Sequence, residues 1–375
     1  MTERESWIAF SAFPQIGPAR FTLIKKYFGN AKKAWKAPIG EYIKIGFSKK
    51  LADSFEKFRK EKFDIGSYLV QLDKLGIQVL RYDDTDYPER LKKIDDSPYI
   101  LYVRKSLKSI RSIKNTIDIK GLSDVSVAVV GTRKMTSYGR EVTERLVTEL
   151  VNAGVTIISG LALGIDSVAH RTAIDTGGRT IAVLGGGLDE IYPPSNRQLA
   201  AEILGKDRGL LLSEYPLFYP SMPQNFPVRN RIVSGLSQGI VVVEGMKKSG
   251  TLLTASSAAS QGREVFAVPG PITSPTSQAP NFLIRQGAKL VESAEDILEE
   301  LKIESRVVKM EARKVIPETK EEKKLLKVLE TEGLDIDTIV RMSGLQAGVV
   351  LGTLTQMELK GLVRNMGGIY RTNSE

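Results

Sequence analysis

The residues most able to do chemistry in this chain are glycines, small hydroxyls and arginines that come directly after predicted strands. They fall in five segments: Gly131-Thr132-Arg133, 159–166, Gly185-Gly186-Gly187, Arg229-Asn230-Arg231 and Ser249-Gly250-Thr251. Glycine-turn amides, helix N-termini and guanidinium groups all bind phosphate. Side chains for general base catalysis or metal binding are scarce, since the chain has one histidine and no cysteine. The pattern predicts a site that holds a phosphate chain without catalysis, with no metal and no cofactor.

The first two segments combine close backbone approach with charge. Arg133 and the adjacent Lys134 follow a glycine turn, while Ser159 ends a strand and Gly160 allows a ligand to come close to the backbone. Asp166 and His170 are four residues apart and therefore share a helix face. A general acid–base pair is possible there. We favour a helix N-cap with an orienting histidine, because no nucleophile is near.

Two further glycine loops lack the spacing of known nucleotide motifs. Gly187 belongs to a triple glycine that implies close approach by a ligand or by another segment, but the segment is not G-x-G-x-x-G, which disfavours a nicotinamide cofactor. Lys248, Gly250 and Thr251 offer a cation, an amide and a hydroxyl at a predicted helix start. They do not have P-loop spacing. Phosphate binding and simple helix capping both remain open.

The segment 215–231 joins aromatic and basic side chains. Tyr215 and Phe218 offer flat faces, and two arginines, Arg229 and Arg231, flank Asn230 at the end of the segment. Aromatic faces beside guanidinium groups suit single-stranded nucleic acid. A proline-rich loop whose aromatics belong to the core is the alternative. We expect Phe226 to be buried in the core and Phe218 and Tyr219 to be open.

The elements that must position these residues form an α/β pattern. Apolar, β-branched runs are found at 127–130, 155–159, 180–184, 210–213, 240–243 and 264–268, with helical patterns between most of them, as at 138–153 and 166–176. Such alternation predicts a doubly wound, mostly parallel, Rossmann-like sheet buried on both faces. Ligands of such sheets bind beyond the carboxyl ends of the strands. All five segments should therefore share one rim.

Flanking regions have different patterns. Residues 1–75 are helical, and shorter strand patterns occur at 77–80 and 99–103. Residues 320–375 read as helices followed by a hairpin with a Gly-Gly turn, which suggests a winged helix. We expect an N-terminal helical domain at 1–75, a core at 76–302, a linker at 303–319 and a C-terminal module at 320–375.

Composition limits the class of protein and its partners. The net charge is +10, and residues 1–119 carry most of it, with 24 Lys and Arg against 15 Asp and Glu. A basic surplus suggests a polyanionic partner, although a solvated lysine-rich surface explains it equally well. The N-terminus lacks the apolar core of a signal peptide and no apolar run could span a membrane. We expect a cytoplasmic protein without a membrane partner.

With these residues together, the chain resembles the DprA/Smf family of DNA-processing proteins over about 82–301. The resemblance rests on Gly131-Thr132-Arg133, on 159–166 with Ala169-His170, and on 181–193. It continues through Ser213-Glu214-Tyr215-Pro216, 226–237, Ser249-Gly250-Thr251 and Ala267-Val268-Pro269-Gly270, in the family's order.

The resemblance implies binding and protection of single-stranded DNA, loading of the RecA recombinase, a homodimer, and a role in natural transformation or recombination. It implies a DNA pocket made by Arg133, Ser159, Gly160, Arg229, Asn230, Arg231, Lys248 and Thr251. Lys134, Gly187, Tyr215, Phe218 and Gly250 complete the set of DNA-binding candidates.

Three departures or additions accompany the resemblance. Ala279-Pro280 stand where the family usually has a glycine. The N-terminal 13–30 is similar to a SAM or helix-hairpin-helix module, with Gln15 where a DNA-binding hairpin often has glycine. The presumed recognition helix of the winged-helix module, 346–359, has no Lys or Arg, so we expect that module to contact protein rather than a DNA groove.

Two other classes stay open. The Gly-Thr loop is also similar to that of nucleotide phosphoribohydrolases of the lysine-decarboxylase-like type, but Leu253 and Thr254 stand where their carboxylates would be needed. A module that senses a mononucleotide is the other alternative. Length-dependent binding of oligonucleotides would distinguish a strand binder from both.

Overall fold

The computed structural model describes residues 1–105, 125–205, 209–247, 249–303, 319–329, 333–359, 362–366 and 368–372. The chain divides into two compact units, Met1–Arg306 and Val307–Glu375. No helix in these described ranges is both long enough and apolar enough to cross a bilayer.

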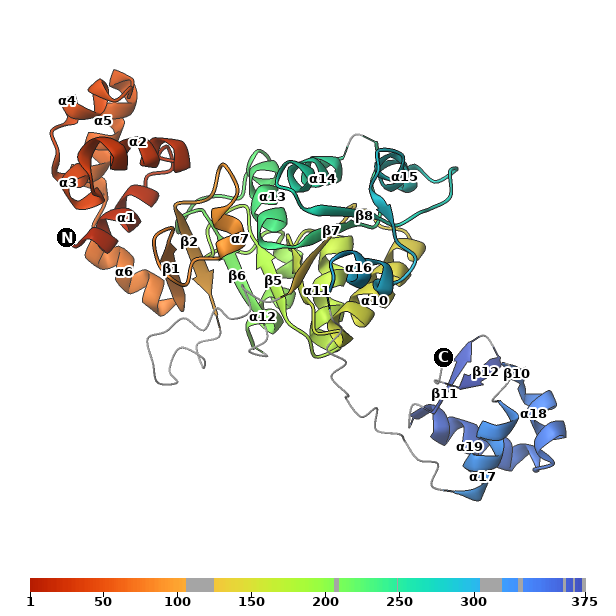
Figure 1. Cartoon of the computed structure of the whole chain (residues 1–375). Helices are drawn as coiled ribbons and strands as arrows, with labels where there is room; N and C mark the ends of the chain where they lie inside the picture. The colour runs from red at the N-terminus through yellow and green to blue at the C-terminus, as the bar shows by residue number, and fades with distance from the viewer. Residues whose placement is uncertain are drawn as a thin grey trace. The chain divides into compact units, whose positions relative to one another are not determined.

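A mostly parallel sheet forms the centre of the first unit (Figure 1). Within the described residues it has nine strands in the order β1-β2-β6-β5-β4-β3-β7-β8-β9. The parallel strands are β3 (Ser126–Val130), β4 (Thr156–Ser159), β5 (Thr180–Val183), β6 (Gly209–Ser213), β7 (Gly239–Val242), β8 (Glu264–Ala267) and β9 (Lys289–Leu290). The two short N-terminal strands, β1 (Ile77–Arg81) and β2 (Ile100–Arg104), extend the same sheet in antiparallel fashion. The predicted doubly wound α/β class is confirmed.

Helices cover both faces of this sheet because successive strand residues point to opposite sides. Val127 and Val129 pack under α10 (Ser137–Asn152), α11 (Ile165–Asp175) and α16 (Ala294–Glu300). Ala128 and Val130 face α13 (Asn225–Leu236) and α14 (Gly250–Ser260). Figure 1 shows these two groups of helices on either side of the strands. Further α-helices in the described part of this unit after β1 are α7 (Glu89–Lys92), α12 (Arg197–Gly205) and α15 (Gln278–Arg285).

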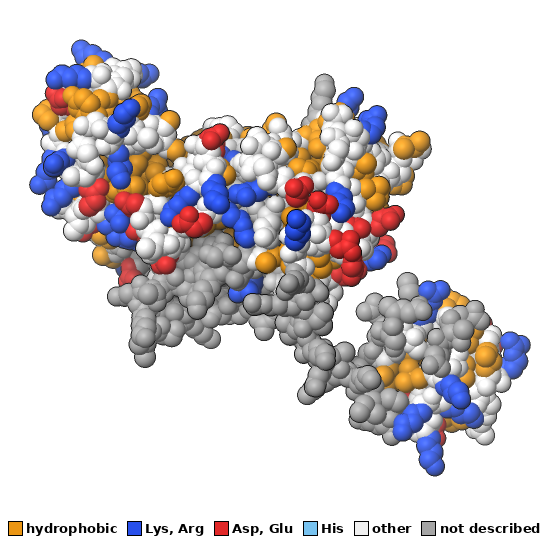
Figure 2. Space-filling view, viewed as in Figure 1, with side chains coloured by type: hydrophobic (Ala, Val, Ile, Leu, Met, Phe, Trp, Pro, Cys, Tyr) orange, Lys and Arg blue, Asp and Glu red, His pale blue; other side chains and the backbone are white. Residues whose placement is uncertain are grey.

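The N-terminal part is helical, as expected, and shares a hydrophobic cluster with the sheet. Its helices are α1 (Glu3–Ser11), α2 (Pro18–Phe28), α3 (Ala31–Lys36), α4 (Ile39–Lys44), α5 (Lys49–Lys57), a π-helical turn (Phe58–Lys62) and α6 (Ile65–Lys74). Trp7, Phe10 and Phe21 belong to one cluster with Ala182 and Leu211 of the sheet. Lys and Arg side chains are spread over the outer surface of these helices (Figure 2).

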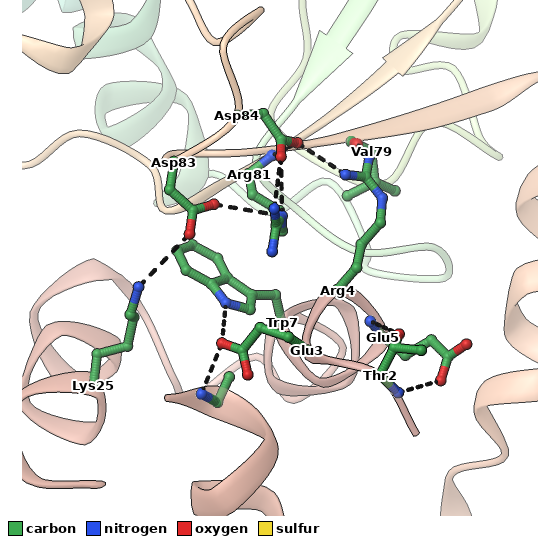
Figure 3. Close-up of polar contacts among 11 residues, drawn as sticks. Thr2, Glu3, Arg4, Glu5, Trp7, Lys25, Val79, Arg81, Asp83 and Asp84 are labelled. Carbon is green, nitrogen blue, oxygen red and sulfur yellow. Dashed lines mark hydrogen bonds and ion pairs between the residues drawn. The ribbon is translucent and has the colours of Figure 1, made fainter. Parts of the chain in front are cut away.

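Polar contacts also hold α1 against the edge strand β1 (Figure 3). Arg4 Nη1 lies 3.0 Å from Asp84 Oδ2, and the same carboxylate pairs with Arg81 at 2.9 Å. Trp7 lies beneath Arg81 and Lys25, whose cationic groups are 5.5 and 4.4 Å from its ring centroid. The charges add to the apolar packing that joins the helical part to the sheet.

The second unit is a small helical module with a three-stranded sheet. It contains α17 (Lys320–Val328), β10 (Leu334–Asp335), α18 (Ile336–Ser343), α19 (Ala347–Leu359), β11 (Val363–Met366) and β12 (Ile369–Thr372), with strand order β10-β12-β11. Leu325, Ile339, Val350, Leu354 and Met357 form its centre. Helices followed by a hairpin confirm the predicted winged helix.

Candidate functional site

A cleft of about 470 Å³ opens where the strand order reverses, between β3 and β7. The chain moves outward from β3 in one direction and from β7 in the other, so their carboxyl-end loops separate and leave a crevice. The loops after β3 and β7, Ala162 and Asp166 after β4, and the start of α13 line it. The cleft lies beyond the carboxyl ends of the strands, the edge of the sheet at which the strand pattern predicted a site.

Gly131-Thr132-Arg133 forms one wall of the cleft. A Cβ at Gly131 would lie 2.5 Å from Cγ1 of Ile165, so only glycine fits there. The Thr132 amide donates to the Glu244 carbonyl at 2.8 Å, which ties this loop to the end of β7. The loop thus leaves Arg133 exposed at the mouth, with its guanidinium carbon 5.2 Å from the Phe226 ring centroid.

Glu244 fixes the shape of this wall, and the sequence pattern did not identify it. Its side chain is buried, with 2% of the residue exposed. Oε2 accepts the Thr136 amide at 2.9 Å, and Oε1 accepts the hydroxyls of Thr136 at 2.6 Å and Thr276 at 2.9 Å. A Cβ at Gly139 would lie 2.2 Å from Glu244 Oε2. The signal that the sequence offered for Glu244 was its position as a charged residue directly after the apolar run 240–243.

Arg229 forms the floor of the cleft and lies against Gly160, where we expected a ligand to come close to the backbone. Arg229 is 4% exposed, and Nη1 donates to the Val183 carbonyl. A Cβ at Gly160 would lie 2.1 Å from this Nη1, so a side chain of the protein supplies the close approach that requires glycine here. Burial lowers the pKa of Arg229, and the nearby Asp166 carboxylate raises it.

Asp166 is not the N-cap of its helix. Gly164 occupies the cap position of α11, and Asp166 lies within the first turn. Its Oδ2 instead accepts the amides of Gly160 at 3.1 Å and Ala162 at 3.4 Å, which closes the loop after β4. Burial raises the pKa of Asp166, and the Arg229 guanidinium opposes that rise.

His170 is fully buried and neutral. The Thr180 hydroxyl donates to the Ile157 carbonyl at 2.9 Å, so it accepts the Nδ1 proton of His170 at 2.6 Å. Burial lowers the pKa of His170 to about 3. His170 is 0% exposed, so it cannot reach a ligand in the cleft, and its role is structural.

The start of α14 forms the opposite wall. Ser249, Gly250 and Thr251 line the cleft, and the helix has no side-chain N-cap bond. Ser249 Oγ is buried with no hydrogen-bond partner among the described residues. Asn230 extends from α13 to donate to Thr254 Oγ1 at 2.8 Å. The uncapped first turn therefore offers donors to an anion; Lys248 lies outside the described residues.

Two candidates support the site without contacting its space. Ser159 is 0% exposed and donates to the Val129 carbonyl at 2.7 Å. Gly187 donates to the Tyr219 carbonyl at 2.9 Å, and a Cβ there would lie 2.7 Å from the Pro216 carbonyl. For Gly187, the close approach is thus by another segment. Lys134 is exposed after the first loop but does not line the cleft.

The cleft that Arg133 lines does not include Arg231, Tyr215 or Phe218. This differs from the single rim that we expected. Arg229 and Arg231 are two residues apart on α13, about 200° around the helix, so they point to opposite sides. Arg231 pairs with Asp96 at 3.0 Å and with Glu214, and it lines a second hollow with Tyr215. Phe218 is 66% exposed, with a positive φ of 64°.

The aromatic side chains of the cleft are Phe226 and Tyr192. The expectation that Phe226 is core is wrong: it is partly exposed and lines the cleft. Tyr192, which we did not select, also lines it, 5.8 Å from Phe226 between ring centroids. The signal for Tyr192 was its place shortly after the triple glycine that follows β5. Tyr219, expected to be open, is partly buried and stacks on Tyr215 at 4.8 Å.

Comparisons with known proteins agree with this architecture. Residues 78–302 match the family model of DNA recombination-mediator protein A, and residues 310–368 match the DprA winged helix domain. Protein Smf of Escherichia coli (strain K12) is 37% identical over 334 residues, covering 87% of this chain and 84% of the relative. DNA processing protein DprA of Bacillus subtilis (strain 168) is 44% identical over 226 residues, covering 60% and 72%.

Two solved structures are also similar. DNA processing protein A from Streptococcus pneumoniae aligns with a TM-score of 0.64 and 31% identity, over 80% of this chain and 98% of that one. The Helicobacter pylori protein, described for its single-stranded DNA binding mode, aligns with a TM-score of 0.51 and 29% identity, over 60% and 95%. The chain therefore belongs to the family of DNA recombination-mediator protein A, also called DprA or Smf.

Proposed function

We propose that this chain is a single-stranded DNA-binding protein without enzymatic activity and that the cleft between β3 and β7 holds the strand. The observation that carries this proposal is the position of Arg133. Its guanidinium lies over the Phe226 ring, and both residues line the same cleft as the uncapped start of α14. One site thus combines a cation, the backbone amides of a helix start without a side-chain cap and a flat apolar face, the three features that bind a nucleotide chain.

The cleft can bind phosphate and base with different groups. Arg133 and the first turn of α14 offer positive charge and amide donors to the backbone. Arg229 adds a charge from the floor, partly balanced by Asp166. Phe226 and Tyr192 offer faces to a base. Since these contacts do not depend on base edges, binding should be tolerant of sequence and sensitive to salt.

The acidic and imidazole groups near the cleft are engaged in holding its loops, which supports a role without catalysis. Glu244 accepts three hydrogen bonds, Asp166 accepts two loop amides, and His170 is buried with Nδ1 bonded. A general base must reach a proton on the substrate. Glu244 and His170 do not line the cleft, and Asp166, which does, is 6% exposed and holds the two loop amides.

The family suggests the wider role. We propose that the protein protects incoming DNA in the cytoplasm, acts as a homodimer and loads RecA in natural transformation or recombination. Support for strand binding comes from the Helicobacter pylori relative, whose structure is described for single-stranded DNA binding. The recombination-mediator family model supports the recombination role.

The test is a titration of the full chain with a single-stranded oligonucleotide, a duplex of the same length and a mononucleotide. We expect the single strand to bind most tightly and its affinity to rise with length. Saturable binding of the mononucleotide without any dependence on oligonucleotide length would instead indicate a sensing module. Release of free base from a nucleoside monophosphate would indicate a phosphoribohydrolase.

A further inference from the structure

A second hollow of about 170 Å³ lies between the N-terminal helices and the sheet. Residues 14–18, which lead from α1 into α2, form one side of it, and residues 98–100 with the segment after β6 form the other. Val228 and Arg231 close it from α13. The hollow thus exists only because the helical part packs on the sheet, and the function proposed above does not use it.

The walls of this hollow are flat and mostly apolar. Tyr99, Tyr215 and four prolines line it: Pro14, Pro18, Pro98 and Pro216. Tyr215 stacks on Tyr219 at an interplanar angle of 11°, which holds its ring as a rigid platform. The volume is below the roughly 300–1,000 Å³ of sites for drug-sized ligands. A single planar ring system fits such a space better than a larger molecule does.

The charges in the hollow do not suit a phosphate. Arg231 is the cation of the lining, and its guanidinium pairs with both Asp96 and Glu214. Two carboxylates face one cation, so the local charge does not favour an anion. An uncharged, hydrogen-bonding ring is therefore the ligand class that the lining favours, and nucleobases belong to that class.

The hollow and the DNA cleft lie on opposite sides of one helix. Arg229 and Asn230 of α13 line the cleft, whereas Val228 and Arg231 line the hollow. A helix with its side chains is about 10–12 Å across. Val228 is 45% exposed at the start of this helix, beside the exposed Pro227, which lines the cleft. A strand that leaves the cleft over this end of α13 meets the hollow next.

We propose that the hollow receives a nucleobase of the same strand, a short distance along from the nucleotides in the cleft. This inference rests on the proposed function and extends the binding site across α13 to the N-terminal helices. The neighbouring backbone would pass the start of α2, which has no side-chain cap and carries the exposed Arg20 in its first turn. Single-strand binding would then need the helical part as well as the sheet.

The test uses Val228→Trp in the full chain, with Val70→Trp as the matched control. Both valines are exposed on helices, so neither substitution disturbs a core, and only Val228 borders the hollow. Thymine oligonucleotides of increasing length are titrated against wild type, both variants and Arg133→Ala. A second measurement maps photo-cross-links from a single 5-iodouracil placed at successive positions along a long oligonucleotide.

We expect Val228→Trp to weaken binding of long oligonucleotides about fivefold or more, while the shortest oligonucleotide that binds wild type is unaffected. We also expect one iodouracil position to cross-link to Tyr215 or to residues 14–18. The proposal requires both results, and the absence of either one overturns it. If Arg133→Ala leaves the shortest oligonucleotide bound as in wild type, the cleft assignment fails instead, and the two failures can be told apart.

Discussion

The guanidinium of Arg229 occupies the space that a side chain at position 160 would need. A Cβ at Gly160 would lie 2.1 Å from Arg229 Nη1 and 2.4 Å from its guanidinium carbon. Position 160 therefore requires glycine because the Arg229 guanidinium fills the space beside it. Arg229 in turn forms the floor of the cleft. Residues far apart in sequence are fitted to each other before any ligand binds.

Gly160→Ala should destabilise the protein by about 1–3 kcal/mol, the usual cost of overpacking. Arg229 is 4% exposed and its Nη1 is bonded to Val183, so it cannot swing into solvent without losing that bond. Urea unfolding of the variant and wild type measures the change. Gly205→Ala is the control, because a Cβ there meets no atom within 4 Å. Equal stability of both variants would contradict the fit.

Glu244→Gln should lower the free energy of unfolding by about 1–3 kcal/mol and weaken DNA binding as well. The two carboxylate oxygens accept hydrogen bonds from the amide and the hydroxyl of Thr136. In glutamine, the side-chain NH2 group would replace one of these oxygens and would face a Thr136 donor instead of accepting from it. Thermal unfolding and oligonucleotide titration report the two effects. Glu264→Gln, at an exposed position on β8, should change neither. An unaltered affinity in Glu244→Gln would show that the first loop does not need this anchor.

His170 should make the protein less stable as the pH falls from about 6.5 toward 3. Burial lowers its folded pKa to about 3, whereas the unfolded pKa is about 6.5, so the unfolded state binds more protons in this window. Asp166 acts in the opposite direction because burial raises its pKa. A comparison of wild type with His170→Asn removes the Asp166 contribution, because Asp166 is present in both proteins.

The asparagine can still donate to Thr180, but it does not titrate. The stability advantage of wild type over His170→Asn should therefore shrink by about 2 kcal/mol between pH 7 and pH 5. Urea denaturation at both pH values measures it. An advantage that is independent of pH would mean that His170 protonates as easily in the folded chain as in the unfolded one.

Phe226→Ala should reduce the affinity for single-stranded DNA by about 1–3 kcal/mol, the usual value of one stacked base. Phe226 lines the cleft beneath Arg133, whereas Phe218 is 66% exposed outside it. Phe218→Ala is the matched control and should bind like wild type. Fluorescence titration with a labelled oligonucleotide compares them. The reverse order of effects would move the stacking site to the 215–219 segment.

The sequence predicted the sheet and a site beyond the carboxyl ends of its strands because both depend on local pattern. The β-branched runs before residues 131, 160 and 185 end where β3, β4 and β5 end, within a residue or two. The strand order could not be read from the same pattern. The antiparallel pairing of β2 with β6, which adds β2 and its partner β1 to the sheet, depends on contacts between distant segments.

The composition of the site was harder to predict because it depends on helix phase and on long-range contacts. Arg229 and Arg231 are neighbours in sequence, yet a 200° separation sends one to the cleft and the other to Glu214. Glu244 and Tyr192 act through residues that are far away in the chain, so their local signals, a charge after an apolar run and a place after the triple glycine, do not show what they contact. Gly160 and Gly187 have the glycine signal, but protein atoms supply the close approach.

The most direct test of the central claim is single-strand binding by Arg133→Ala at several salt concentrations, with Arg145→Ala as the control. Arg145 is exposed and paired with Glu149, away from the cleft. We predict that Arg133→Ala loses about 1.5–3 kcal/mol of binding free energy and that its salt slope falls by about one. Affinity and slope equal to those of wild type and Arg145→Ala would contradict the assignment of the cleft as the DNA site.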